Sequence, residues 1–181
     1  MKTIEQLLDE LIQREGGHVN DPRDRGGETK YGITKAVARE QGYHGAMRDL
    51  PLSTARSIYR HIYWIVPGFD HVATVSPHIA AELFDTGVNM GPRVAAGFLQ
   101  RALNALNRNG KDYPELVVDQ RIGPATTDAL RGFRSARGSV GLVVLLKALE
   151  ALQGARYIEL AEGRSANEAF LYGWLAHRIG Q

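Results

Sequence analysis

Apolar residues recur with the period of an α-helix along most of this chain, and this pattern limits the fold more than any other feature of the sequence. Near the N-terminus the spacing predicts a helix over residues 4–15, with an apolar face formed by Ile4, Leu7, Leu8, Leu11 and Ile12. Thr3 and Gln6 have the spacing of a capping box at its start, and Gly16-Gly17 is a stop signal at its end.

Caps and apolar stripes predict further helices over residues 35–41, 54–66, 77–89, 94–106, 124–133, 140–161 and 167–179. Residues 18–34 lack such a stripe, so we expect an ordered loop there, with a short hairpin around Gly26-Gly27. Residues 107–119 are expected to form a polar loop, in which Val117-Val118 is the other strand-like hint. The predicted fold class is therefore mainly α, with a small hairpin or loop.

The composition excludes several classes of protein. Hydrophobic residues make up 44% and charged residues 23% of the chain, as in a globular domain. There is no cysteine, which excludes disulfides, a thiolate nucleophile and Cys-ligated metal. The six histidines show no metal-ligand spacing, so we expect no metal and no cofactor. The formal net charge of +2 is too small for a dedicated nucleic-acid binder.

Nothing in the sequence is typical of a targeting or membrane segment. The first twelve residues carry Glu5, Asp9 and Glu10, where a signal peptide would be apolar. The longest apolar run, around Val143 to Leu146, is far shorter than the ~20 residues of a transmembrane helix. We therefore expect neither a signal peptide nor a transmembrane helix.

Glu15 is the first candidate catalytic residue. It lies eleven residues after Ile4, and at about 100° per residue this brings it back to within roughly 20° of the apolar face. Apolar surroundings and the negative end of the helix dipole would both raise the pKa of this carboxyl group, as a general acid requires. Alternatively, the helix end frays and Glu15 is an ordinary surface residue.

The loop after Glu15 favours the catalytic interpretation. Its glycines let the backbone approach a ligand closely, and Asp24 with Thr29 can hold a water molecule or a sugar hydroxyl opposite Glu15. Two carboxylates in unlike settings are what glycoside hydrolysis needs. A calcium loop or a phosphate loop is the competing interpretation, but the ligand spacing of an EF-hand and of a Walker motif is missing.

These residues resemble a known family. Glu15-Gly16-Gly17, Asp24, Gly26-Gly27, Thr29 and Gly32-Ile33-Thr34 look like the signature of glycoside hydrolase family 108, the phage-type endolysin muramidases with a lysozyme-like fold. Residues 84–91, 119–126 and 173–178 are similar to the peptidoglycan-binding region that follows in that family. The resemblance implies a catalytic muramidase region over residues 1–90 and a helical peptidoglycan-binding region over residues 91–181, packed into one globule.

The resemblance also implies roles for individual residues. Glu15 is the catalytic acid, and Asp24 and Thr29 complete the catalytic set. The spacing from Thr29 to the following glycine differs by one residue from the family pattern, so Glu28 or Lys30 can share its role. The expected substrate-binding residues are Gly26, Gly27, Tyr31, Asp85 and Asn89.

A polar pair and an aromatic group can each be explained either by substrate binding or by ordinary helix structure. Asp85 and Asn89 lie one turn apart, so they either contact the cleft or make hydrogen bonds at the helix end. Tyr59, Tyr63 and Trp64 either line a saccharide cleft or, as helical spacing favours, pack in the core.

By this resemblance the protein is an endolysin that hydrolyses the β-1,4 bond between N-acetylmuramic acid and N-acetylglucosamine in peptidoglycan and lyses the host cell. The alternatives are a lytic transglycosylase on the same bond and a non-catalytic peptidoglycan-binding protein. We expect a monomer that stays in the host cytoplasm until a separate pore releases it to the periplasm or cell wall.

The charges divide unevenly along the chain. Residues 1–90 hold 10 basic and 12 acidic side chains, whereas residues 91–181 hold 12 basic and 8 acidic ones. Arg131, Arg134, Arg137 and Lys147 lie in a stretch, residues 129–149, that has no acidic residue. This stretch is either a solvated helix face or a surface for weak contact with the anionic cell envelope.

Overall fold

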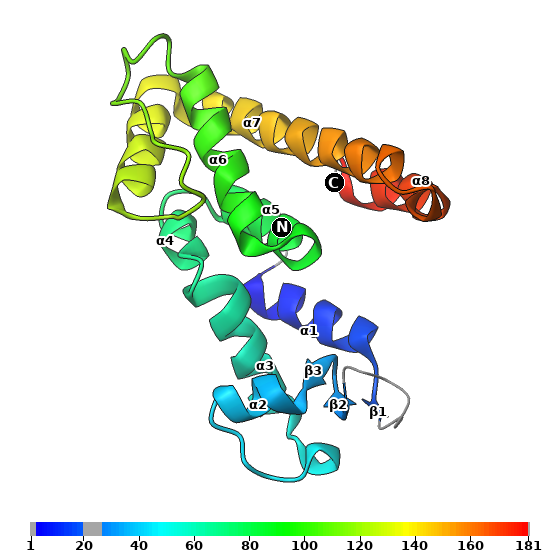
Figure 1. Ribbon diagram of the computed structural model, residues 1–181. Helices are drawn as coiled ribbons and strands as arrows, with labels where there is room; N and C mark the ends of the chain where they lie inside the picture. The colour runs from blue at the N-terminus through cyan, green and yellow to red at the C-terminus, as the bar shows by residue number, and fades with distance from the viewer. Residues whose placement is uncertain (1–2, 20–26, 181) are drawn as a thin grey trace. The chain divides into compact units, whose positions relative to one another are not determined.

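The computed structural model describes residues 3–19 and 27–180 and divides the chain into two compact units, Met1–Val66 and Pro67–Gln181 (Figure 1). The division predicted after residue 90 separates regions of different function, whereas this one separates compact parts of the chain. The predicted division therefore stays a prediction.

Helix α1, Ile4–Glu15, opens the first unit and confirms the predicted N-terminal helix. Both bonds of the capping box are present, from Gln6 N to Thr3 Oγ1 at 3.3 Å and from Thr3 N to Gln6 Oε1 at 2.8 Å. Leu8, Leu11 and Ile12 are buried, as the apolar stripe predicts. The helix ends at Gly16, whose φ of 81° is one that a side chain would disfavour.

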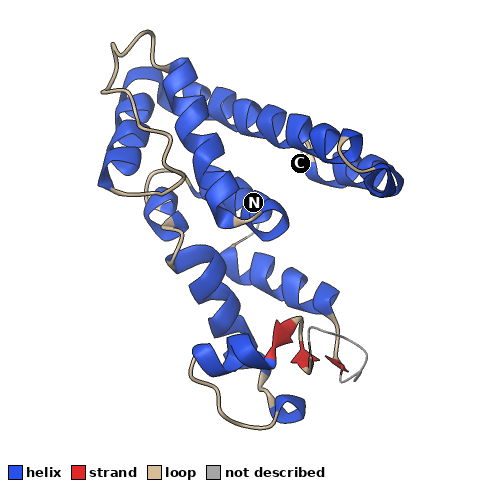
Figure 2. Cartoon of the chain, in the orientation of Figure 1, coloured by secondary structure: helices blue, strands red, loops and turns tan. Residues whose placement is uncertain are grey.

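Three short strands follow α1 and form an antiparallel sheet in the order β1-β2-β3 (Figure 2). They are β1, His18–Val19; β2, Thr29–Lys30; and β3, Ile33–Thr34. His18 pairs with Lys30 and Val19 with Thr29, so β1 and β2 flank the predicted hairpin tip. Gly26 of that tip lies outside the described residues. Tyr31 and Gly32 link β2 to β3 with φ values of 53° and 72°, and positive φ at both positions is the requirement of a type I′ turn.

The other helices of the first unit support this sheet. They are α2, Lys35–Glu40; the 3₁₀ turn η1, Met47–Asp49; α3, Leu52–Arg60; and the π-helical turn η2, His61–Ile65, which continues α3. Thr34 caps α2, with its hydroxyl accepting from Val37 N at 3.3 Å. Helix α3 packs against α1 and is joined to it by ion pairs from Arg56 to Asp9 and from Arg60 to Glu5.

The second unit consists of helices, which confirms the mainly α prediction. They are α4, Phe69–Ala73; α5, Pro77–Met90; α6, Pro92–Leu106; α7, Pro124–Glu162; the 3₁₀ turn η3, Ser165–Asn167; and α8, Glu168–Arg178. Helix α8 folds back along the end of α7 (Figure 1). The short helix α4 was not predicted, since it has too few residues to show a period. It begins after Gly68, which has a φ of 80°.

Helix α7 joins the two helices that the sequence predicted over residues 124–133 and 140–161. Its backbone is interrupted at Gly138, where φ is 65° and ψ is −161°, so the predicted break is present as a kink. An 18-residue window of α7 has a mean hydropathy of 1.3 and is 22% buried. By length and composition alone α7 could therefore cross a membrane, a property that was not predicted from the sequence. The core helices of globular proteins can have the same length and hydropathy.

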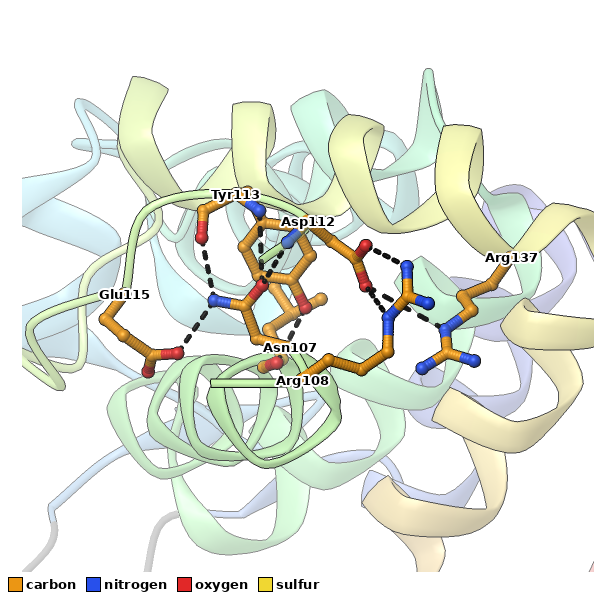
Figure 3. A network of polar contacts seen from close by, with 7 residues as sticks. Asn107, Arg108, Asp112, Tyr113, Glu115 and Arg137 are labelled. Atoms are coloured by element: carbon orange, nitrogen blue, oxygen red, sulfur yellow. Dashed lines mark hydrogen bonds and ion pairs between the residues drawn. The ribbon is translucent and has the colours of Figure 1, made fainter. Parts of the chain in front are cut away.

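The predicted polar loop after α6 is present and is ordered by Asn107 (Figure 3). The buried Asn107 amide donates to Tyr113 O at 2.8 Å and to Glu115 Oε1 at 2.7 Å, and its carbonyl oxygen accepts from the backbone N–H groups of Asp112 and Tyr113. Arg108 pairs with Asp112 beside it. The strand hint at Val117-Val118 was wrong, because these residues are exposed and pair with no strand in the described chain.

Candidate active site

The candidate site begins at the C-terminal end of α1. Glu15 is the last residue of this helix, and β1 starts three residues later at His18. The buried Leu8, Leu11 and Ile12 confirm that α1 has an apolar face. Glu15 therefore stands at the junction of a core helix with the small sheet, and its role as general acid stays a prediction.

Strand β2 and the turn after it carry two of the predicted site residues. Thr29 is half-buried in β2, between β1 and β3. Tyr31, in the turn, accepts a hydrogen bond at its carbonyl oxygen from the Tyr59 hydroxyl of α3 at 2.8 Å. Lys30 donates from Nζ to Arg48 O at 2.5 Å and lies 5.2 Å from the centre of the Tyr31 ring. These contacts fix the β2–β3 hairpin to α3 and η1.

Glu28 has partners that the sequence analysis did not predict. Its Oε1 lies 3.0 Å from His18 Nε2, and its Oε2 lies 3.4 Å from Lys35 Nζ. Its carbonyl oxygen also accepts from Lys35 N at 2.9 Å. The hydrogen bond with His18, followed by the contact with Lys35, lowers the pKa of Glu28 below its ordinary value. Glu28 is therefore an ionised carboxylate that ties the start of β2 to β1 and to α2.

The structure does not describe all of the predicted site. Asp24 and Gly26 lie outside the described residues. Gly27 precedes β2 and has a φ of 71°, a conformation that glycine adopts without strain.

Asp85 and Asn89 belong to α5 in the second unit. Asp85 Oδ1 pairs with Arg178 at 2.6 Å, and Asn89 Nδ2 donates to Asp85 O at 2.8 Å. The second of these bonds is the helix-end interaction that the sequence analysis gave as the alternative to a cleft contact. A substrate contact by either residue stays a prediction.

The aromatic residues of α3 and η2 are packed as helical spacing favours. Tyr59 and Trp64 are buried, and Tyr63 is half-buried and stacks on Tyr59 with the ring centres 5.9 Å apart. Burial of this kind makes them supports of the site rather than the walls of an open cleft.

Acid-catalysed hydrolysis needs a proton donor and a group that orients water, and the residues predicted for these roles are Glu15 and Thr29. Glu28 is unsuited to donate a proton, since its hydrogen bonds with His18 and Lys35 favour the ionised form.

Two family models match the chain, one in each half. Residues 8–91 match the family model described as Glycosyl hydrolase 108, and residues 94–179 match the model described as Predicted Peptidoglycan domain. The solved structure of Brucella abortus SagA is similar, with 23% sequence identity and a TM-score of 0.60 over 96% of this chain and 87% of that chain. At this identity the likeness shows the fold alone. No curated protein matches the chain.

Proposed function

We propose the specific reaction of this chain, which is a glycoside hydrolase with a family 108 domain followed by a predicted peptidoglycan domain. The protein hydrolyses the β-1,4 bond between N-acetylmuramic acid and N-acetylglucosamine in peptidoglycan. The observation that supports this most is the place of Glu15, at the end of a core helix and directly before the glycine-framed sheet within the family 108 match.

In the proposed mechanism Glu15 protonates the leaving glycosidic oxygen. Asp24 stabilises the oxocarbenium-like centre or, together with Thr29, positions the attacking water. Glu28 supports this division of roles, because two basic side chains hold it in the ionised form and leave Glu15 as the candidate acid. Gly26, Gly27 and Tyr31 bind the substrate in this scheme, and Gly27 and Tyr31 flank β2.

The experiment is hydrolysis of purified sacculi by the Glu15→Gln variant. We expect the release of reducing ends to fall by about a hundredfold or more, since a positioned general acid contributes a factor of about 10² to 10⁴. The matched control is Glu40→Gln, at an exposed carboxylate that ends α2 in the same unit. Full activity of Glu15→Gln with an unchanged circular dichroism spectrum would refute the assignment.

We also propose a weak contact between the basic stretch, residues 129–149, and the anionic cell envelope. Arg131 and Arg134 line a shallow hollow on the second unit together with Thr74, Val75 and Ser135. Arg131 pairs with Asp128, and Arg134 donates to Val75 O, so both guanidinium groups are held in place there. Binding to sacculi that does not change with salt would contradict this contact.

The remaining proposals concern the protein in the cell. It acts as a monomer without a cofactor, binds no nucleic acid and lyses the host. A separate pore releases it from the cytoplasm to the wall. Lysis that requires coexpression of a pore-forming protein would support this route.

A further inference from the structure

A polar cluster lies inside the second unit, where α7 packs against both α5 and α8. Helix α5 contributes Glu82, Asp85 and Thr86, helix α7 contributes Glu150, Gln153 and Tyr157, and helix α8 contributes Arg178. Gln153 Nε2 donates to Thr86 Oγ1 at 3.0 Å and to Asp85 Oδ2 at 3.4 Å, and Arg178 donates to Asp85 Oδ1 at 2.6 Å. We call these seven residues the α5–α7–α8 cluster.

Negative charge exceeds positive charge in this cluster. Three carboxyl groups, those of Glu82, Asp85 and Glu150, are accompanied by the single guanidinium of Arg178. Burial, followed by the charges of Asp85 and Glu150, raises the pKa of Glu82 to about 7. A cation placed beside Glu82 would stabilise its ionised form and so oppose this rise of the pKa.

Two buried polar atoms of the cluster have no hydrogen-bond partner among residues 3–19 and 27–180. They are Gln153 Oε1 and the Tyr157 hydroxyl, on side chains that are 0% and 3% exposed. Such unpaired buried groups cost stability, and native proteins leave few of them without a partner. Gln153 Oε1 can only accept a hydrogen bond, so the missing partner is a donor.

The cluster has an exposed edge at Asp85 and an aromatic flank. The Asp85 side chain is 37% exposed, so its carboxylate can be reached from outside. Trp174 of α8 stacks on Tyr157 with the ring centres 5.2 Å apart, and Phe170 stacks on Trp174 at 6.1 Å. Aromatic faces attract organic cations and pack against their aliphatic stems.

These features fit an organic ammonium group better than a metal ion. No group of three His, Cys, Asp or Glu side chains in the described chain lies close enough to hold a metal ion. The ammonium group has three N–H donors, which match the carboxylates and the free amide oxygen.

We propose that the α5–α7–α8 cluster binds a primary ammonium group of the peptide stems of peptidoglycan, with Glu82, Asp85 and Gln153 as acceptors. This inference rests on the proposed substrate and adds a second point of recognition, on the peptide rather than on the glycan. Helix α5 lies in the family 108 match and helices α7 and α8 in the peptidoglycan-domain match, so neither segment builds the site alone.

The experiment is cosedimentation of the full chain, in the cold, with sacculi whose amines are free or have been converted to neutral amides by acetic anhydride. We expect about tenfold weaker binding to acetylated sacculi, as for the loss of a charge-assisted hydrogen bond. Binding to untreated sacculi should strengthen from pH 6 to pH 8, as Glu82 ionises among Asp85, Glu150 and Arg178. Equal binding to both preparations would overturn the proposal.

Two variants separate ligand binding from a merely structural role. Glu82→Gln should lose the preference for free amines and the pH dependence, whereas Glu162→Gln, at an exposed carboxylate that ends α7, should keep both. Tyr157→Phe removes an unpaired hydroxyl, so its thermal midpoint should stay equal or rise while binding weakens severalfold. Unchanged binding by a folded Glu82→Gln variant would refute the site.

The proposed reaction is tested separately. Reducing ends released from acetylated sacculi would show that hydrolysis is intact even if both preparations bind equally. Failure to release them from untreated sacculi would count against the proposed function, whatever the binding result.

Discussion

Glu82 makes the stability of the second unit depend on pH, and the variant Glu82→Gln should remove that dependence. The ordinary pKa of this carboxyl group is 4.5, and burial beside Asp85 and Glu150 raises it to about 7 in the folded protein. Between these values the folded state keeps a proton that the unfolded state has lost. The stabilisation is therefore fully present below about pH 4.5 and is lost as the pH rises through about 7.

The magnitude follows from the two pKa values. They differ by about 2.5 pH units, and each unit corresponds to about 1.4 kcal/mol, which gives a loss of up to about 3 kcal/mol between pH 4.5 and pH 8. Glutamine has nearly the same shape, can still bond to Thr86 and does not titrate. The variant should therefore match the wild type within about 1 kcal/mol at pH 4.5 and exceed it by about 3 kcal/mol at pH 8.

Urea unfolding at a series of pH values measures this difference. Trp174 of α8 stacks on Tyr157 and reports on the second unit, and a Trp64→Phe background removes the fluorescence of the other tryptophan. Asp128→Asn is the matched control, since its carboxylate is exposed. Parallel pH profiles for the wild type and Glu82→Gln would show that Glu82 does not cause this pH dependence.

Three further substitutions test the scaffold by urea unfolding. Asn107→Ala removes four hydrogen bonds of a fully buried side chain and should cost about 3–4 kcal/mol, at about 1 kcal/mol per bond; a cost below about 1 kcal/mol would contradict the network of Figure 3. Gly68→Ala places a Cβ 2.9 Å from Ile122 O at a φ of 80° and should cost about 1–3 kcal/mol, whereas Gly123→Ala, with open space around it, should cost less. Tyr59→Phe loses the bond to Tyr31 O and should cost about 1 kcal/mol; no change would mean that this bond does not hold the hairpin.

The helices could largely be predicted from the sequence because each rests on local signals. The capping box at Thr3 and Gln6, the break at Gly138 and the loop after Leu106 all come from residues a few positions apart. Helix α4 was not predicted, because its five residues do not complete two turns and so show no helical period. The hairpin was expected, but its register was not, since register depends on pairing across residues 20–28.

The electrostatic partners could not be predicted, because they are distant in sequence. Arg178 reaches Asp85 across 93 positions, and Gln153 reaches the same residue across 68. Nothing in the local pattern around any of these residues indicates that they meet. The same holds at shorter range for Glu28, whose contact with His18 depends on how β1 and β2 pair. Motif spacing thus indicates candidate site residues, whereas the charged partners of a side chain depend on the fold.

Mass spectrometry of the fragments released from purified peptidoglycan distinguishes the proposed hydrolysis from its alternatives. We expect muropeptides with hydrolysed, reducible N-acetylmuramic acid ends, and their loss when Glu15 is replaced by Gln. Fragments that end in 1,6-anhydro sugars would contradict hydrolysis and identify a lytic transglycosylase. No released fragments, with the chain still bound to the wall, would identify a binding protein without this activity.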